Sequence, residues 1–213
     1  MSERTRRRPR SAPGHGDRLG PELVEAAREI LAREGSTDAV TLRGVARHLG
    51  VTAPSIYLHF DSREDLVAAA VAAQFDRLRR ATEEAARGAD TPLARLRAGM
   101  LGYCRFGEEE PGGYAVLFSL PLAPAVLHGS SDPAARALDS AAGRAFDGLV
   151  ASVAACQDDG SLPGDDAWPV ARRAWTALHG MVSLRTVMPA FDWDPIEDAV
   201  DDLLLGLGAS ASA

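Results

Sequence analysis

The stretch that decides the fold is TLRGVARHLGVTAPSIYLHF, residues 41–60. Its first half repeats apolar side chains at the spacing i, i+3, i+4 and i+7, which gives a short helix one apolar face: Leu42, Val45, Ala46 and Leu49. Gly50 follows at once and can adopt the left-handed backbone conformation of a tight turn. The pattern therefore predicts a short helix that ends abruptly at this glycine.

The second half of the stretch predicts another short helix, over residues 52–60. Thr52 can cap its start, and Pro54 fits the first turn, where a backbone amide has no helical partner. Ile56 and Phe60 lie four residues apart, so they share the face that packs against the first helix. The side chains left outside are small or able to form hydrogen bonds: Thr52, Ala53, Ser55, Tyr57 and His59.

Two short helices joined by so tight a turn are typical of a helix-turn-helix, whose second helix lies in the major groove of DNA. An ordinary helical hairpin within a bundle is the alternative. Such a hairpin would more often carry long charged side chains on its outer face, and these block close approach to base edges. The pattern therefore favours a DNA-binding element.

Residues 41–66, TLRGVARHLGVTAPSIYLHFDSREDL, closely resemble the DNA-binding signature of the TetR family of bacterial transcriptional regulators. Two positions depart from that signature. Gly44 stands where the family more often has a bulkier helix former, and Arg63 stands where it usually has lysine. The glycine is expected to cost the helix up to about 1 kcal/mol relative to alanine, which leaves the resemblance intact.

A second run, AWTALHGM at residues 174–181, looks like the Trp-His-Gly signature of one group of C-terminal domains in the same family. Earlier residues fit the same group: Tyr103, Phe106, Pro111, Tyr114 and Phe118. The resemblance covers most of the chain from about residue 20, and residues 121–165 carry least of it. It implies a homodimer that binds double-stranded DNA with its N-terminal part and a small-molecule effector with its C-terminal part.

The charge distribution gives the two halves of the chain different partners. Of the net charge of -7, residues 1–80 contribute 14 arginines against 11 acidic residues, a balance of +3. Residues 81–213 contribute 9 arginines against 19 acidic residues, a balance of -10. Because phosphates attract the first half and repel the second, we expect only the N-terminal end to face DNA.

The predicted fold class is all-α, with a three-helix, homeodomain-like domain over residues 18–66 and a helical effector-binding and dimerisation domain over residues 67–213. The first helix is expected from near Gly20-Pro21 to Glu34. Ser62 and Asp65 have the spacing of a capping box that opens a long helix, to about residue 87, joining both domains. Capping residues precede prolines at Thr91, Asp132 and Asp194. Later helices are expected over residues 91–109, 112–120, 131–158, 165–188 and 194–208.

Residues 1–17 are rich in arginine and poor in apolar side chains, and we expect them to be disordered when the protein is alone. One interpretation is a solvated tail. The other is a basic arm that follows phosphates or enters the minor groove, as homeodomain arms do.

DNA contacts are expected from the outer face of the helix-turn-helix and its neighbours: Thr41, Arg43, Thr52, Ala53, Ser55, Tyr57, His59 and Arg63. Tyr57 and His59 suit phosphate and sugar, whereas the small residues near the helix start can meet base edges. Arg63 lies in the first turn of the long helix, beside free amides that favour an anion. The alternatives are that His59 only finishes the recognition helix and that Arg43 or Arg47 is merely solvated.

The expected ligand-binding residues are aromatic, methionine and histidine side chains at helical spacing: Met100, Tyr103, Phe106, Tyr114, Phe118, Trp175, His179 and Met181. Pockets between helices are apolar with a few polar anchors, which suits a hydrophobic or aromatic effector. Side chains of these types are more often core than pocket. His179 in particular is expected to be packed and hydrogen-bonded, next to a close approach allowed by Gly180.

The expected homodimer interface combines a stripe on the last helix with one on the helix before it: Trp175, Leu178, Val182, Ile196, Val200, Leu203, Leu204 and Leu207. Two helices from each subunit would form a four-helix interface whose two-fold axis sets the recognition helices about 34 Å apart. The alternative is that the last stripe docks on its own domain.

No catalytic residue, metal ligand set or cofactor is expected, because the five histidines are scattered and no nucleophile elbow, phosphate loop or zinc motif occurs. The acidic run at residues 108–110 is interpreted as a solvated helix end. Cys104 and Cys156 are expected to be reduced core thiols of a cytoplasmic protein, with a redox sensor as the alternative. No apolar run approaches the length of a membrane span and no secretory signal is recognised, so no membrane partner is expected.

The predicted function is a ligand-responsive repressor that binds a palindromic operator and is released by a small hydrophobic effector. The effector is expected to shift the helix over residues 62–87 and change the spacing of the recognition helices. The alternatives are activation, a structural DNA-binding dimer without effector, and an enzyme with a DNA-binding appendage.

Overall fold

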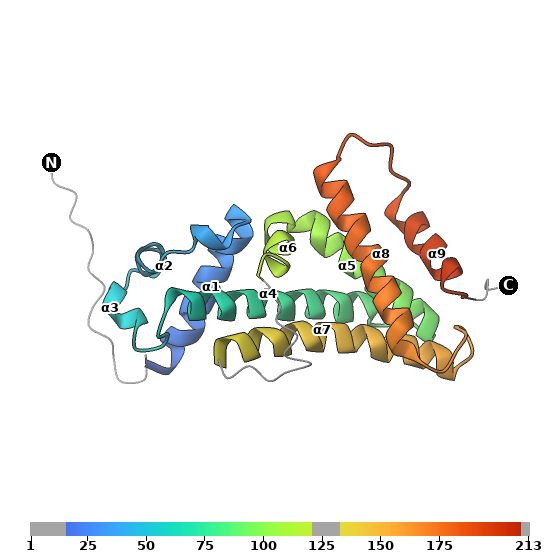
Figure 1. The fold of residues 1–213 in the computed structure, drawn as a ribbon, viewed down its shortest axis with the longest axis horizontal. Coiled ribbons are helices and arrows are strands. Elements are labelled where there is room, and N and C mark those ends of the chain that lie inside the picture. The colour runs from blue at the N-terminus through green and yellow to red at the C-terminus, as the bar shows by residue number, and fades with distance from the viewer. Residues whose placement is uncertain (1–15, 121–132, 210–213) are drawn as a thin grey trace.

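The structure, a computed structural model, describes residues 16–120 and 133–209, and within these ranges every regular element is a helix (Figure 1). The all-α prediction is confirmed. In chain order the elements are α1 (Gly16–Glu34), a short 3-10 helix η1 (Thr37–Ala39), α2 (Leu42–Leu49), α3 (Ala53–Ile56), α4 (Arg63–Ala86), α5 (Pro92–Glu109), α6 (Pro111–Leu117), α7 (Pro133–Asp158), α8 (Ala167–Val187) and α9 (Ile196–Gly206). The expected N-terminal arm lies outside the described residues except for its last two positions, and Asp132 lies outside them as well.

The elements α1 to α3 and the start of α4 form the end of the molecule that we call the head. Its centre is built from fully buried side chains of all four helices: Leu23, Leu31, Val45, Ile56 and Leu66. Gly50 has φ 67° and ψ 28°, the left-handed conformation that the turn between α2 and α3 was expected to need. The helix-turn-helix therefore packs as the apolar spacing predicted.

The second helix of this pair is much shorter than the predicted span of residues 52–60. α3 is one turn long, and Tyr57 to His59 continue as a turn rather than as helix. Thr52 caps α3 in position, but its side chain makes no capping hydrogen bond. The amide of Phe60 still donates to the carbonyl of Ile56 at 3.0 Å, so the chain folds back directly onto the core.

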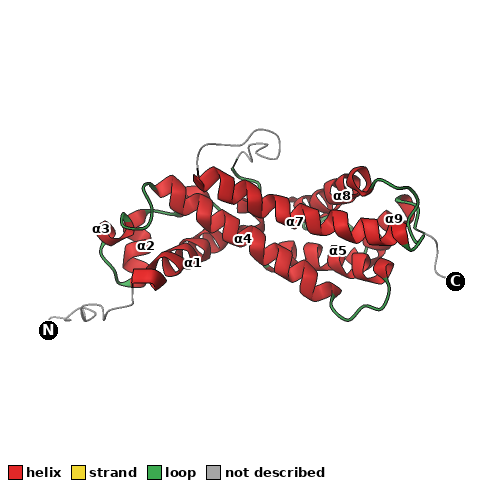
Figure 2. Cartoon of the chain, turned by 90° about the horizontal axis from the view of Figure 1, so that it is seen from below, coloured by secondary structure: helices red, strands yellow, loops and turns green. Residues whose placement is uncertain are grey.

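The long helix α4 joins the head to the remaining helices, which we call the body (Figure 2). Ser62 caps it as predicted: its Oγ accepts from the amide of Asp65 at 3.0 Å and donates to that residue's carboxylate at 2.7 Å. In the body, α4 packs against α5 and α7, α8 crosses α5 and α7, and α9 packs mainly on α5. One continuous apolar core runs through both parts.

Some helix starts differ from the sequence-based expectation. α1 begins at Gly16, so Pro21 lies inside the helix instead of opening it, and one helical hydrogen bond is lost there. Thr91 caps α5 as expected, its Oγ1 accepting from the amide of Ala94 at 3.2 Å. Asp194 does not cap α9, because Pro195 keeps an extended ψ of 141° and the helix begins only at Ile196.

None of the helices in the described ranges is long and apolar enough to cross a lipid bilayer.

Candidate DNA-binding surface and internal cavity

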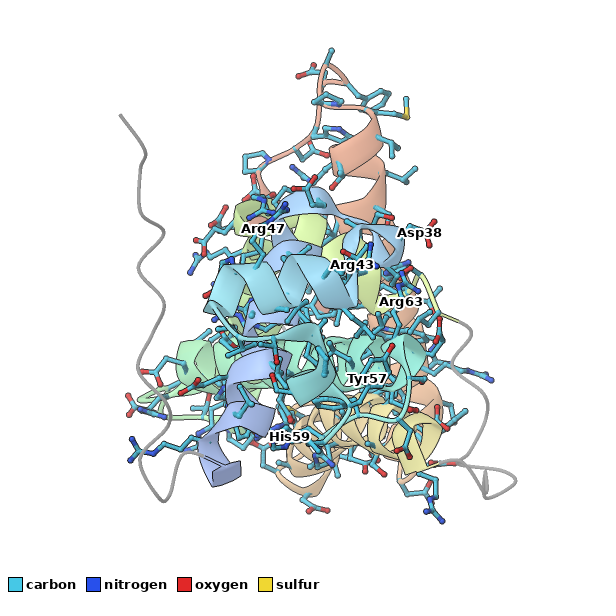
Figure 3. The ribbon with its side chains drawn as sticks, turned by 90° about the vertical axis from the view of Figure 1, so that its left-hand side faces the viewer. Asp38, Arg43, Arg47, Tyr57, His59 and Arg63 are labelled. Atoms are coloured by element: carbon cyan, nitrogen blue, oxygen red, sulfur yellow. The ribbon has the colours of Figure 1, made fainter. Side chains whose placement is uncertain are left out.

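The outer surface of α2 and α3 forms one end of the molecule, and the side chains expected to contact DNA gather there. Figure 3 views this end directly and shows Arg43 and Arg47 on α2 above Tyr57 and His59. The side chains of all four are exposed, and Tyr57 has 58% of its surface accessible although its ring is apolar. An exposed aromatic ring beside unpaired arginines suits contact with the sugar-phosphate backbone.

The small residues of α3 and the cap of α2 lie on the same surface. Thr52 is exposed, and Ala53 and Ser55 are half-buried on the single turn of α3. The Oγ of Ser55 donates to the carbonyl of Thr52 at 2.5 Å and accepts from the Oγ1 of Thr52 at 3.4 Å. Thr41 Oγ1 accepts from the amide of Gly44 at 3.0 Å and so caps α2. A short helix with small side chains permits close approach to base edges.

The sequence suggested that the side chain of Arg63 is free to bind phosphate, but in the structure its guanidinium group is already hydrogen-bonded. Its Nε donates to the carbonyl of Val40 at 2.6 Å, and its Nη2 donates to the carbonyl of Thr37 at 2.5 Å. Asp38 lies 3.8 Å from the same nitrogen. The guanidinium group therefore ties η1 and the start of α2 to the first turn of α4.

Positive charge at this end comes chiefly from α2. Arg43 and Arg47 form no ion pair with any described residue, whereas His48 Nε2 lies 3.1 Å from a carboxylate oxygen of Glu29 on α1. Two unpaired guanidinium groups on an exposed helix can neutralise phosphates, and their contribution to binding will weaken as salt rises.

An apolar cavity of about 1050 Å³ lies in the body between α4, α5, α7 and α8. Four of the eight expected ligand residues line it: Met100, Tyr103, Phe118 and Trp175. The other four do not. Tyr114 and His179 pack behind the wall residues Tyr103, Phe118 and Trp175, and Met181 is half-buried beside the core. Phe106 instead borders a smaller, more polar hollow of about 470 Å³ beside Arg77 and Glu110. Helical spacing alone could not separate wall from core, because both are apolar.

The remaining walls of the cavity come largely from residues that were not expected to bind ligand. They include aromatic and aliphatic side chains of α4, α5, α7 and α8: Phe75, Leu78, Leu96, Phe146, Leu149, Trp168 and Leu178. The spacing of the α7 residues in the sequence could have indicated that they share one face. Residues 139, 142, 146 and 149 repeat at i, i+3, i+7 and i+10, which places them on one helical face.

A chain of hydrogen bonds runs from the cavity wall into α6 and α8. Tyr103 Oη lies 2.9 Å from Tyr114 Oη, which lies 2.7 Å from His179 Nδ1, and Ser183 Oγ lies 3.5 Å from His179 Nε2. Burial raises the pKa of Tyr114 to about 12 and raises that of Tyr103 further, and burial lowers the pKa of His179. These groups are therefore neutral hydrogen-bonding partners at pH 7. Gly180, by contrast, has open space around it and makes no close approach within the subunit.

The contact between head and body is tight where α6 meets α1. A Cβ atom on Gly112 would overlap the carbonyl oxygen of Ala32, so the two backbones touch. Nearby, buried Gln74 of α4 accepts from Arg28 Nη1 of α1 at 3.3 Å and donates to Glu110 at 3.3 Å.

Glu110 corrects the interpretation of residues 108–110 as a solvated helix end. Its carboxylate is half-buried and is also paired with Arg77 of α4, while Glu108 and Glu109 are exposed. Nothing in the linear pattern of three glutamates singled out the last one, because its partners lie more than 30 residues away on α4.

The residues expected at a dimer interface separate into two groups. Leu178, Val182, Val200 and Leu204 are buried within their own subunit, so a partner cannot reach them in this conformation. Trp175 is half-buried and packs against Phe118 and Phe146. Ile196, Leu203 and Leu207 are half-buried beside the core. The stripe on α9 thus docks on its own domain, and ion pairs from Arg97 to Asp201 and Arg105 to Glu197 fasten it to α5.

Other large apolar side chains of the same region are exposed. They lie at the C-terminal end of α8, in the loop that follows, and on the outer side of α9: Leu184, Val187, Met188, Phe191 and Leu205. A cluster of this kind marks an interaction surface more often than isolated apolar residues do.

Both cysteine thiols are free and buried. Burial raises the pKa of Cys104 to about 12 and also raises that of Cys156, which makes each a poor nucleophile. Within residues 16–120 and 133–209, no three histidine, cysteine or acidic side chains gather as a metal site would require.

Comparisons with known proteins match both halves of this architecture. The family model of bacterial regulatory proteins of the tetR family matches residues 23–70, and that of the tetracyclin repressor-like C-terminal domain matches residues 96–206. An uncharacterized HTH-type transcriptional regulator of Mycobacterium tuberculosis is 32% identical over 190 residues, which cover 88% of this chain and 78% of that protein.

Solved structures share the fold over most of its length. A protein of unknown function from Rhodococcus sp. RHA1 is 27% identical with a TM-score of 0.73, and the match covers 92% of this chain and 99% of that one. The transcriptional regulator FadR from Bacillus subtilis, solved in complex with stearoyl-CoA, is 16% identical with a TM-score of 0.63 and covers 88% and 96% of the two chains. At that identity the second likeness is one of fold alone.

Proposed function

The chain belongs to the TetR family of DNA-binding transcriptional regulators, and from that premise we propose that it is a homodimeric repressor released from its operator by a small hydrophobic effector. The observation that carries the proposal is the pairing of an exposed helix-turn-helix with a large apolar cavity on the same long helix, α4.

The proposed DNA contacts are those of the exposed head surface. Tyr57, Arg43 and Arg47 would meet phosphates, and the single turn of α3 would bring Thr52 and Ser55 to the base edges. Arg63 would act mainly by holding η1 and α2 in position, because its nitrogens are already used by two backbone carbonyls.

The proposed effector site is the cavity between α4, α5, α7 and α8. Its volume and its aromatic walls suit a drug-sized apolar molecule. The complex of FadR with stearoyl-CoA supports the idea that this fold can hold a long hydrocarbon ligand. Trp168 and Trp175 both line the cavity, so occupancy should change intrinsic fluorescence.

The proposed dimer uses the outer faces of α8 and α9. The exposed side chains of Leu184, Val187, Met188, Phe191 and Leu205 supply apolar area, and the open space around Gly180 lets a second helix come close. A two-fold axis through this surface would present two heads to successive turns of DNA.

The proposed coupling follows from contacts between the cavity and the head. Tyr103 lines the cavity and is hydrogen-bonded to Tyr114 of α6, and α6 touches α1 through Gly112. A ligand that displaces Tyr103 would move α6 against α1, while α4 carries the same shift directly to the head. Small movements of this kind change the spacing of two recognition surfaces in a dimer.

The test is recovery of DNA fragments bound by the purified protein from its own genome. We expect enriched fragments to share an inverted repeat with half-sites about one helical turn apart, or a multiple of that spacing. Tyr57→Ala should weaken binding to such a site by roughly 1 to 3 kcal/mol, whereas Arg173→Ala on exposed α8 should leave it unchanged. Equal weak binding to all fragments by a monomer would contradict the proposal.

The effector part of the proposal is tested on the same site. A ligand that raises the unfolding midpoint must also weaken DNA binding, because linkage between the two sites is reciprocal. If cavity ligands stabilise the protein and leave DNA affinity unchanged, the protein is a DNA-binding dimer without effector control.

A further inference from the structure

Asp139 places a carboxyl group in the cavity wall that no described residue neutralises. Only 7% of this residue is exposed, and its Oδ2 atom is buried without a hydrogen-bond partner in the described part of the chain. No described arginine or histidine lies within ion-pair distance of it. A buried polar atom without a partner costs free energy, so a ligand group that supplies the missing hydrogen bond would be stabilised there.

The other charged side chains around the cavity are already engaged or exposed. Arg79 pairs with Glu83 at 2.6 Å, Arg87 pairs with Glu84 at 2.8 Å, and Arg95 donates to the carbonyls of Ala89 and Asp90. The guanidinium of Arg172 lies 5.1 Å above the ring of Trp168 and is exposed. Arg79 Nε is also buried without a hydrogen-bond partner, but it lies 3.6 Å from a carboxylate oxygen of Asp76, and the same guanidinium group pairs with Glu83. Asp139 is therefore the buried charged side chain of the lining that has no ion-pair partner among the described residues.

The position of Asp139 along α7 sets where the ligand's polar group would lie. Arg144 of α7 pairs with Asp76 of α4 at 3.2 Å, and both helices run in the same direction in Figure 1. Asp139 therefore lies toward the head, on the same side of the cavity as Phe75 of α4, whose ring centroid lies 6.1 Å from that of Phe118.

Aromatic side chains continue the same wall away from Asp139. Phe146 lies seven residues further along α7, roughly 10 Å away at the rise of an α-helix. Its ring centroid is 6.0 Å from that of Trp168 and 6.1 Å from that of Trp175. On α4 the lining extends from Phe75 to Arg87, a rise of roughly 18 Å. The cavity is thus elongated, with a carboxyl group at one end and aromatic walls beyond it.

We propose that the effector is a cationic amphiphile whose ammonium or amidinium group pairs with Asp139 while its hydrocarbon part lies along Phe146, Trp168 and Trp175. This inference rests on the proposed role of the cavity as the effector site. Burial raises the pKa of Asp139 above its usual value. A cation beside the carboxyl group favours its ionised form, which supports pairing between the two groups.

The test compares three probes with the same twelve-carbon chain: dodecylamine, dodecanol and dodecanoate, each below its micelle-forming concentration at pH 7. The readout is tryptophan fluorescence in a Trp193→Phe background, because Trp193 packs on Phe191 outside the cavity and would mask the signal of the two cavity tryptophans. We expect dodecylamine to bind at least tenfold more tightly than dodecanoate and several-fold more tightly than dodecanol.

Two matched variants assign that preference to one carboxyl group. Asp139→Asn should lower the affinity for dodecylamine about tenfold and change that for dodecanol less than threefold. Asp147→Asn removes an exposed carboxyl group from the same cavity and the same helix, and it should leave all three affinities unchanged. Unfolding of each variant, followed by circular dichroism, shows that it is folded at the temperature of the titration.

The outcomes separate this inference from the effector site itself. The proposed cationic head group is contradicted if dodecanol binds as tightly as dodecylamine. It is also contradicted if Asp139→Asn lowers the affinity for all three probes equally. In both cases the apolar cavity remains the proposed effector site. A preference for dodecanoate contradicts the cationic head group in the same way. If none of the probes changes the fluorescence or the unfolding midpoint, both the inference and the proposed effector cavity fail.

Discussion

The head and the body of this protein build their functional surfaces in opposite ways. The proposed DNA-binding residues come from little more than 20 consecutive positions, and most are exposed on α2, α3 and the turn that follows. The cavity residues come from four helices spread over about 100 positions, and many are buried. A linear motif can therefore identify the first surface, whereas the second exists only once α4, α5, α7 and α8 have packed. The experiments below ask how far the two parts depend on each other.

The largest effect is expected from a substitution in the core of the head. Ile56 of α3 is 0% exposed and belongs to the continuous apolar core. Ile56→Ala should lower the free energy of unfolding by about 2–5 kcal/mol, since it removes buried methyl groups and leaves a cavity. Leu58→Ala is the matched control, because Leu58 is 81% exposed two residues away and its loss should cost less than about 0.5 kcal/mol. Equal losses measured by urea denaturation would contradict this account of the packing.

The junction between head and body gives the next largest effect. Gly112→Ala should destabilise the protein by about 1–3 kcal/mol, because the added methyl group meets the backbone carbonyl of Ala32 rather than a flexible side chain. Gly148→Ala on α7 has open space around it, so it should be neutral or stabilise the helix by up to about 1 kcal/mol. Should Gly112→Ala prove as harmless as Gly148→Ala, the head and the body are less tightly joined than the backbone contact indicates.

The sequence predicted the head well because its signals are local. The apolar spacing in α2, the left-handed Gly50 and the cap at Ser62 each involve residues within one or two helical turns. The length of α3 was overestimated, because Tyr57 to His59 contain no helix-breaking residue, and yet they form a turn before Phe60 packs against the core. The role of Arg63 was also missed, because its partners at Thr37 and Val40 lie more than 20 residues away.

The body shows the limit of the same reasoning. Periodicity identified α9 as amphipathic, but the apolar stripe could equally face a partner or its own domain, and only the packing on α5 decides between them. Likewise Met100 and Phe106 were treated alike, although one lines the apolar cavity and the other borders a polar hollow. Position around a helix is set by the sequence, whereas the identity of the neighbouring helix is a tertiary property.

A smaller effect separates the two possible roles of Arg63. Arg63→Lys keeps the positive charge but cannot bridge the carbonyls of Val40 and Thr37 in the same way. We expect a loss of about 1 kcal/mol in stability, modest because the side chain is partly exposed, with an unchanged salt dependence of DNA binding. Arg43→Lys, at an exposed position, is the control and should leave stability unchanged. If Arg63→Lys is as stable as the wild-type protein, the bridging role is wrong and Arg63 is better explained as a phosphate ligand.

The smallest effect is the pH dependence that His179 gives to the body. Burial among Tyr114, Phe118 and Trp175 lowers the pKa of His179, while the unfolded chain keeps a value near the usual 6.5. As the pH falls below that value, the unfolded state binds a proton before the folded state does. The contribution of His179 to the free energy of unfolding therefore decreases as the pH falls from 7 toward 5.5.

The substitution His179→Gln removes this contribution and should flatten the slope in that window, and His59→Gln on the exposed head controls for the loss of an imidazole elsewhere. Acidic groups with lowered pKa, such as Glu25 and Asp201, lose their stabilisation only at lower pH, so they do not obscure the test. Urea denaturation at pH 7 and pH 5.5 measures both slopes. If His59→Gln flattens the slope and His179→Gln does not, protonation acts on the head, and the buried chain from Tyr103 to His179 plays no part in it.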